Sequence, residues 1–258
     1  MATRARTKEP RAAGAVDPSI EYLRARLAVL ELRVAAAVAR RRAADPNPDD
    51  QFRGLYISDD QVDALLAEEL PAAGLTPPDP DAASLLQQAE AAADAAEKRG
   101  ADIRLRRLAR AFGLDAGDVE ILLVALAPDF DPRFERLYGY LQDDVTRRRA
   151  GAGLALELCG ADFTGRRRLD PAGALVVGGL VLVEETDRPF LTRPLRVPDR
   201  VAWHLLGDDT TDPALEPLLA PAVQADGDTA ASLERALRGG ARLAYVRERV
   251  GAAGAALA

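Results

Sequence analysis

The residues closest to a recognised chemical pattern stand near the C-terminal end of the sequence. Ala241–Val246 is predicted to form a buried strand, and Arg247–Gly254 follows it as a loop that leads into an alanine-rich helix. A strand, a glycine-rich loop and a helix form the context of a P-loop, where backbone N–H groups and a lysine hold phosphates and a serine or threonine holds magnesium. Aligning Gly251 with the loop glycine places Gly254 at the lysine position. Gly251 and Gly254 are therefore the candidate nucleotide-binding residues.

The groups that carry P-loop chemistry are missing from this loop. Ala255 occupies the serine or threonine position, and Glu248 occupies that of the first glycine, where its charge would face the phosphates. We interpret the loop as degenerate and expect no catalytic residue and no bound cofactor in residues 1–258. Two explanations stay open: an intact nucleotide-binding module follows in a longer chain, or the likeness arises by chance.

The single cysteine and the single histidine limit the other kinds of site. Cys159 excludes an internal disulfide and any multi-cysteine metal site, and its place at the end of the apolar run Leu154–Cys159 predicts a buried structural thiol. His204 stands beside Trp203 in a helical pattern, so we expect a packing or surface role rather than Ser-His-Asp catalysis. No metal site is expected.

Three short segments are candidates for contacts with other molecules. The segment Phe52–Ser58 holds an apolar and aromatic cluster, Phe52, Leu55 and Tyr56, which either docks on a partner or packs on its own domain. The runs Arg147–Arg149 and Arg166–Arg168 either contact phosphates or lie on a solvated face. The proposed interaction residues are Phe52, Leu55, Tyr56, Arg147, Arg148 and Arg149.

Composition and charge exclude several classes of protein. The 258 residues carry a net charge of −7, which argues against a general nucleic-acid coat protein. The first 44 residues differ from the rest, because ten Arg or Lys residues there face four Asp or Glu. No stretch reaches the ~18 apolar residues of a membrane span, and no apolar segment of a secretory signal follows the basic N-terminus. We therefore expect a cytoplasmic protein without a membrane partner.

The core must rest on Leu, Val and Ala, because aromatic residues make up only 5% of the chain, and this favours helices. After a disordered basic tail (1–18), a long helix is predicted over 19–45, with Ser19 as its N-cap. Apolar residues form one stripe on it: Ile20, Leu23, Leu27, Leu30, Val34 and Ala37. Another subunit, the chain's own winged helix or an outside partner could cover this stripe. Residues 46–81 are predicted to be a linker that contains the docking segment and a short helix, with Val62, Leu65 and Leu66 as its apolar face.

Residues 82–207 are predicted to form a winged-helix domain in a mainly α chain. A polar helix over 82–99 is followed by four more, at 103–112, from Asp115 to Pro128, at 132–141 and at 153–159. Apolar runs at 175–177, 180–183 and 190–197 around a turn at 185–189 predict a β-hairpin wing. A last helix begins at Pro198. Residues 208–228 are an acidic linker, and 229–258 are the truncated start of the module that contains the degenerate loop.

One segment also resembles a known family. Leu137-Tyr-Gly-Tyr-Leu-Gln-Asp-Asp-Val-Thr-Arg-Arg-Arg149 is similar to the winged-helix domain at the N-terminus of AAA+ ATPases encoded with bacterial extracellular contractile injection systems, which are phage-tail-like particles. The segments Phe52–Ser58 and Asp115–Ala127, and the wing with the helix Trp203–Gly207, resemble it as well. The resemblance implies a parent that binds ATP and magnesium, forms a homo-oligomeric ring and drives particle assembly or cargo loading. It also implies that residues 229–258 are the truncated start of a degenerate AAA+ module.

We therefore expect a non-catalytic interaction and positioning region of such an ATPase, which binds protein partners or itself. A winged-helix DNA-binding regulator is the first alternative, but the helix taken as the reading helix, Leu154–Leu158, is apolar and lacks the arginine, asparagine and glutamine that read bases. The second alternative is an ATP-binding module that is active by itself. Salt-dependent binding of duplex DNA would favour the first alternative, and ATP turnover would favour the second.

Overall fold

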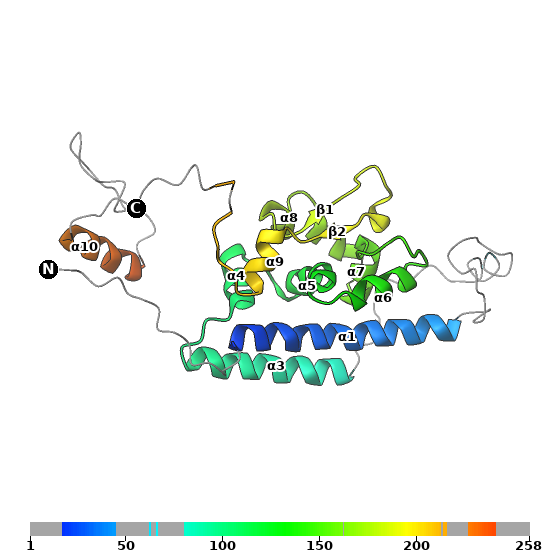
Figure 1. Ribbon diagram of the computed structural model, residues 1–258, viewed down its shortest axis with the longest axis horizontal. Coiled ribbons are helices and arrows are strands. Elements are labelled where there is room, and N and C mark those ends of the chain that lie inside the picture. The colour runs from blue at the N-terminus through cyan, green and yellow to red at the C-terminus, as the bar shows by residue number, and fades with distance from the viewer. Residues whose placement is uncertain are drawn as a thin grey trace. The chain divides into compact units, whose positions relative to one another are not determined.

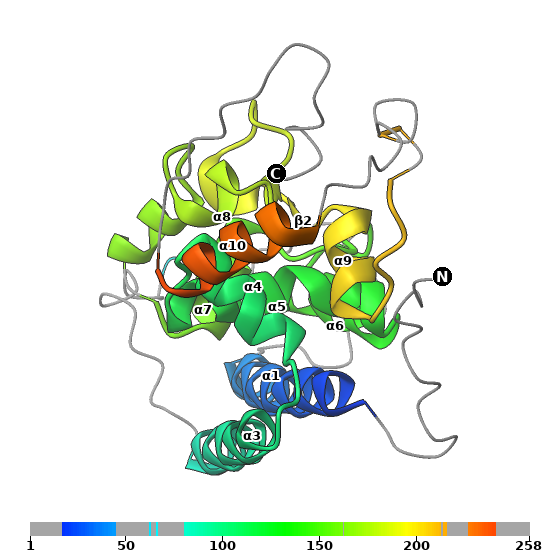
Figure 2. The same cartoon turned by 90° about the vertical axis from the view of Figure 1, so that its left-hand side faces the viewer.

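Two long helices lie side by side in the computed structural model, which describes residues 17–44, 62, 66, 80–161, 163–212, 214–215 and 227–240. Helix α1 spans Pro18–Ala44, and α3 spans Pro80–Lys98 and runs antiparallel to it (Figure 1). α1 lies between α3 and the smaller helices of the chain (Figure 2). The chain divides into two units, residues 1–209 and 210–258. Of the second unit, the main described element is helix α10 (Gly227–Arg238).

The apolar stripe of α1 is covered by the chain's own winged-helix region and by α3. Five of its six residues are at most 5% exposed: Leu23, Leu27, Leu30, Val34 and Ala37. On one side they meet a row of small residues on α3, namely Ala82, Ala89, Ala93 and Ala96, which lets the two helices approach closely. On the other side they share one core with the helices that follow. Of the three coverings that the sequence left open, the structure therefore shows the one within the chain.

Four helices follow α3, close to their predicted places: α4 (Arg104–Phe112), α5 (Ala116–Phe130), α6 (Arg133–Leu141) and α7 (Ala152–Leu158). Local signals set their ends. Gly113 ends α4 in the left-handed conformation at φ 65°. Asp115 begins α5 with a capping box: the Asp115 carboxylate accepts the Asp118 N–H, and the Asp118 carboxylate accepts the Asp115 N–H.

The predicted N-cap of α1 is wrong. The Asp17 carboxylate accepts the Ser19 N–H at 3.0 Å, so Asp17 performs the capping role expected of Ser19. The Ser19 hydroxyl instead accepts the backbone N–H of Arg104, the first residue of α4, at 2.9 Å. Ser19 is only 2% exposed because it joins the starts of two helices that are distant in sequence.

The predicted end of α5 at Pro128 is also wrong, since the helix continues to Phe130. Proline lacks the N–H that would bond to the carbonyl four residues earlier, which here belongs to Val124. The hydroxyl of Tyr138, a fully buried residue of α6, donates to that carbonyl at 3.0 Å. Burial raises the pKa of Tyr138 and so keeps the hydroxyl protonated as a donor. The hydrogen bond lost to Pro128 is thus replaced from α6.

The wing is shorter than predicted. Residues 175–177, expected as a strand, belong to the short helix α8 (Ala174–Val177), because a short apolar run fits a buried helical turn as well as a strand. A 3-10 helix, η1 (Phe163–Leu169), precedes it. The hairpin consists of β1 (Leu182–Val183) and β2 (Leu195–Arg196), paired antiparallel with Val183 opposite Leu195.

The returning arm of the wing begins as the 3-10 helix η2 (Phe190–Thr192), whereas the sequence predicted a strand from Phe190. Pro189 and Pro194 flank this stretch, and neither has an N–H to donate to a sheet. Helix α9 (Asp199–Leu205) follows the wing as predicted. The wing and α8 lie on the far side of α5 from α1 and α3 in both views (Figures 1 and 2).

A buried arginine joins α1 to α3 and α5. Arg26 is 6% exposed, and its guanidinium donates to Glu120 Oε1 on α5 at 2.6 Å and to Glu90 Oε1 on α3 at 2.8 Å. Burial alone would lower the pKa of Arg26, but the charges of Glu120 and Glu90 outweigh burial and raise it. Arg33, about two helical turns further along α1, pairs with the other oxygen of Glu120. The Glu120 carboxylate therefore neutralises two cations of α1.

Replacing Glu120 by leucine leaves Arg26 buried with one fewer counter-charge. We expect Glu120→Leu to lower the free energy of unfolding, measured in urea, by about 3 kcal/mol. Glu31→Leu is the matched control, because Glu31 and Arg133 form a solvent-exposed pair, and loss of such a pair costs at most about 1 kcal/mol. Adding Arg26→Met to Glu120→Leu should recover part of the loss. Equal effects of the two single substitutions would contradict this account.

Candidate interaction surface

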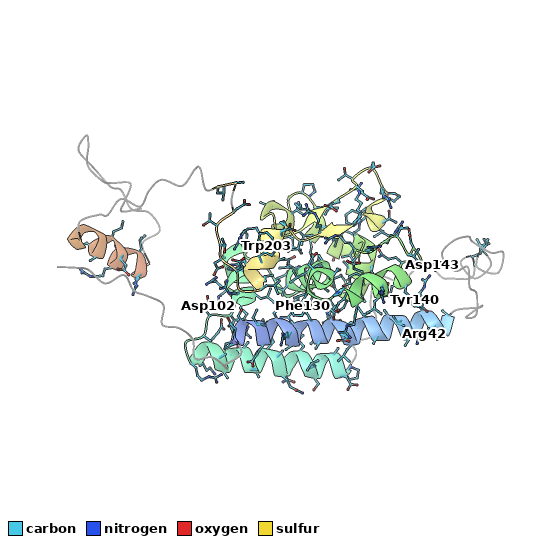
Figure 3. The ribbon with its side chains drawn as sticks, in the orientation of Figure 1. Arg42, Asp102, Phe130, Tyr140, Asp143 and Trp203 are labelled. Atoms are coloured by element: carbon cyan, nitrogen blue, oxygen red, sulfur yellow. The ribbon has the colours of Figure 1, made fainter. Side chains whose placement is uncertain are left out.

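A groove with an apolar floor separates the C-terminal half of α1 from α6. Its volume is about 720 Å³, and it is lined by Glu31, Val34, Ala35, Val38, Ala39, Arg42, Pro132, Arg133, Arg136 and Leu137. Apolar side chains form its floor, while three arginines and one glutamate surround them. Arg42 stands near the C-terminal end of α1 (Figure 3), and its neighbour Arg41 pairs with Asp143 at 3.4 Å. Such a surface suits a chain segment that is apolar on one side and acidic on the other.

The spacing of residues along α1 explains why the groove exists. The lining positions 31, 35, 38 and 42 recur at three- and four-residue intervals, so with Ala39 they form a stripe beside the buried one, and Val34 borders both. On α6, Phe134 and Tyr138 point into the core, which leaves Arg133, Arg136 and Leu137 to form the opposite wall. The Asp131 carboxylate fixes the start of that wall by accepting the Arg133 N–H at 2.9 Å.

The three groove arginines differ in their contacts. Arg133 is held by Asp131 at 2.7 Å and by Glu31 at 3.2 Å, and hydrogen bonding to Asp131 raises its pKa. Arg42 and Arg136 have no carboxylate partner within the part of the chain that the structure describes. Their guanidinium groups are exposed at the edges of the groove, where they can meet carboxylates of a bound segment.

A second hollow, of about 420 Å³, lies on the other side of α6 and shares Arg136 with the groove. Its lining includes Gly139, Tyr140, Val145 and Arg148. A Cβ at Gly139 would lie 3.3 Å from the Asp144 carbonyl oxygen, so any larger residue would require that backbone to shift by a few tenths of an ångström. The segment 137–149, which carries the strongest family resemblance, thus lines both hollows.

The proposed interaction residues Arg147, Arg148 and Arg149 all reach carboxylates of their own domain. The ion pairs measure 3.1, 3.8 and 3.2 Å, and their partners are Asp144, Glu135 and Asp129 in that order. Arg148 is the most exposed, at 75% of its side chain, and it also lines the second hollow. Phe52, Leu55, Tyr56, Gly251 and Gly254 lie outside the described residues. Sequence reasoning did not find the groove, although the second stripe of α1 was a signal for it.

The helix that leads into the wing is poorly suited to the major groove of DNA. The sequence assigned the reading position to Leu154–Leu158, but α7 is followed by η1 and α8, and α8 directly precedes the hairpin. The helix next to the wing is therefore α8 and not α7. α8 has only four residues, and α7 has five of its seven buried. Neither helix offers an exposed face long enough for base contacts.

The arginines of η1 are also partly engaged within the chain. Arg168 pairs with Asp118 at 2.9 Å and with Asp115, and Arg166 lies over the Phe190 ring, 4.5 Å from its centroid. Hydrogen bonding to Asp115 raises the pKa of Arg168. Arg167 has no acidic partner among the residues described. Among the three arginines of η1, Arg167 is therefore the one most open to a phosphate contact.

The surroundings of Cys159 and His204 indicate structural roles for both side chains. Burial raises the pKa of the Cys159 thiol to about 12, so it is not a nucleophile at neutral pH. His204 Nδ1 lies 2.6 Å from Asp209 Oδ1, beside the guanidinium groups of Arg104 and Arg107. No group of three His, Cys, Asp or Glu residues in the described ranges is arranged to hold a metal ion. Trp203 is half-exposed next to this cluster (Figure 3).

Comparison with known families fits this architecture. The model of a family described as a winged helix domain, variant, matches residues 5–219. The chain belongs to this family. The match begins before α1 and extends past α9, so the groove lies wholly within the winged helix domain. No curated protein and no solved structure matches the chain. None of the described helices is long and apolar enough to cross a bilayer.

The arrangement of arginines predicts weak DNA binding by the winged helix domain. Among the described residues outside the groove, Arg148, Arg166 and Arg167 are the cations best placed for phosphates, so their contribution to the slope of the logarithm of affinity against the logarithm of salt should be no steeper than about −3. Arg166→Gln with Arg167→Gln should make that slope shallower by about 2. Fluorescence anisotropy of a labelled duplex at several salt concentrations measures both. A specific site that survives physiological salt and competitor DNA would contradict the assignment as a protein-binding surface.

Proposed function

We propose that this winged helix domain is a non-catalytic interaction region that positions an AAA+ ATPase within a bacterial contractile injection system, during particle assembly or cargo loading. The resemblance of residues 137–149 to the winged-helix domains of such ATPases supports the class. Those residues form most of the hollow of about 420 Å³ beside α6 and contribute Leu137 to the groove between α1 and α6, so the segment that suggests the family adjoins the candidate binding surface.

The observation that carries the proposal is the α1–α6 groove, with its apolar floor and with Arg42 and Arg136 at its edges. Apolar grooves flanked by charges are typical sites for amphipathic protein segments. The helices nearest the wing offer no comparable surface for DNA, which favours a protein partner over a nucleic acid. The exposed Arg167 favours weak phosphate contacts only, so a DNA-binding regulator is the second candidate.

The parent ATPase supplies the chemistry in this proposal. ATP and magnesium bind an intact P-loop module of the parent, which works as a homo-oligomeric ring in the cytoplasm. The winged helix domain contributes contacts that place the ring on its target or join neighbouring subunits. The degenerate loop at Gly251 and Gly254 takes no part in turnover, because it lacks the lysine and the hydroxyl that hold the phosphates and magnesium.

A charged residue on the groove floor should abolish this positioning. In a bacterium that encodes this chain with an injection system, we expect Val38→Asp to give particles that are incomplete or lack cargo, as judged by electron microscopy and cargo immunoblots. Val177→Asp places the same charge on an apolar residue of α8 that is 71% exposed and lies outside the groove, and it should leave the particles normal. Normal particles with Val38→Asp would contradict the proposal.

Residues 1–258 alone should neither hydrolyse ATP nor bind it tightly. The reason is the absence of the lysine and hydroxyl groups that contact the β- and γ-phosphates and magnesium. Release of inorganic phosphate from ATP should equal that of a buffer blank, and equilibrium dialysis should show no retained nucleotide. Turnover that is lost on Gly251→Asp would show an active module and exclude a purely non-catalytic role.

A further inference from the structure

We propose that the α1–α6 groove binds residues 59–70 of a second copy of this chain. This inference rests on the proposed interaction function and names the partner as another copy. The groove extends along α1 from Glu31 to Arg42, which is about 16 Å at 1.5 Å per helical residue. It therefore accommodates about three helical turns of a bound segment.

Residues 59–70 carry the complementary chemistry. They read Asp-Asp-Gln-Val-Asp-Ala-Leu-Leu-Ala-Glu-Glu-Leu, with five carboxylates and no lysine or arginine. The apolar residues Val62, Leu65, Leu66 and Leu70 stand at intervals of three, one and four, as on one face of a helix. As a helix, twelve residues extend about 18 Å, close to the length of the groove. Their apolar face suits the floor of valine, alanine and leucine.

The charges of the two surfaces are opposite. Arg42 and Arg136 lie at the edges of the groove without carboxylate partners among the described residues, whereas residues 59–70 carry five carboxylates and no cation. Opposite charges around an apolar contact set its orientation and speed association. Neither the net charge of −7 nor the composition of the whole chain reveals this local complementarity.

The exposure of Val62 and Leu66, the two residues of this segment that the structure describes, favours a second copy over the same chain. They are helical residues that are 41% and 79% exposed. A contact between the groove of one copy and the segment of the next leaves a free groove and a free segment at the two ends. Such a contact repeats, and it gives a closed ring or an open row of copies.

Complementation between two variants tests this inference on the full chain of 258 residues by sedimentation velocity. Val38→Asp disables the groove and keeps the segment, whereas Leu66→Asp disables the segment and keeps the groove. The wild-type chain should assemble with rising concentration, and each variant alone should bind itself roughly thirtyfold more weakly, the effect of losing a central apolar anchor. An equimolar mixture of the two variants should form a one-to-one dimer and nothing larger.

Controls separate assembly from folding. Val177→Asp should assemble like the wild type, and Arg42→Glu with Arg136→Glu, both at exposed positions, should weaken assembly without lowering the melting temperature. A monomeric wild type, a mixture that stays monomeric, or variants that assemble normally would each overturn the inference. A monomer whose melting temperature falls on Leu66→Asp would place the segment in its own groove, which also overturns it. The proposed function is judged separately, by the particles of the Val38→Asp strain.

Discussion

Arg26 lies where α1 meets α3 and α5, and its guanidinium group has almost no access to water. A buried cation is tolerated only where carboxylates neutralise it, and Glu120 and Glu90 do so from two different helices. Sliding α1 by one turn would move Arg26 away from both carboxylates at once. The ion pairs therefore fix the register of α1, while the apolar stripe supplies most of the free energy of packing, at about 1.5–3 kcal/mol for each large side chain fully buried.

The candidate surface depends on that register. With Leu30 and Val34 directed toward the core, the neighbouring stripe that includes Ala35, Val38 and Arg42 faces α6. α6 in turn is tied to α5 by the hydrogen bond from Tyr138 to the Val124 carbonyl. Both walls of the groove are thus set by buried polar contacts with α5. This gives the surface a fixed shape, which is what recognition of a partner requires.

The sequence predicted the features that local chemistry decides and missed those that depend on distant residues. Gly113 and Asp115 end and begin their helices as expected, because their signals act within a few residues. The continuation of α5 past Pro128 depends on Tyr138, ten residues further along. For the same reason Arg147–Arg149 were recognisable as a charged run, but the acids that pair with them and the open stripe of α1 emerge only once the helices are placed together.

Hydrogen exchange of the full chain, followed by mass spectrometry, tests most directly whether α1 is a fixed wall of the winged helix domain. Backbone amides from Leu23 to Ala37 should exchange as slowly as those from Val119 to Ala127 in α5, because both helices share one core and open together. Exchange of the α1 amides that is orders of magnitude faster, while α5 stays protected, would contradict the account. In that case α1 opens independently, and the groove between α1 and α6 is not a lasting feature of the domain.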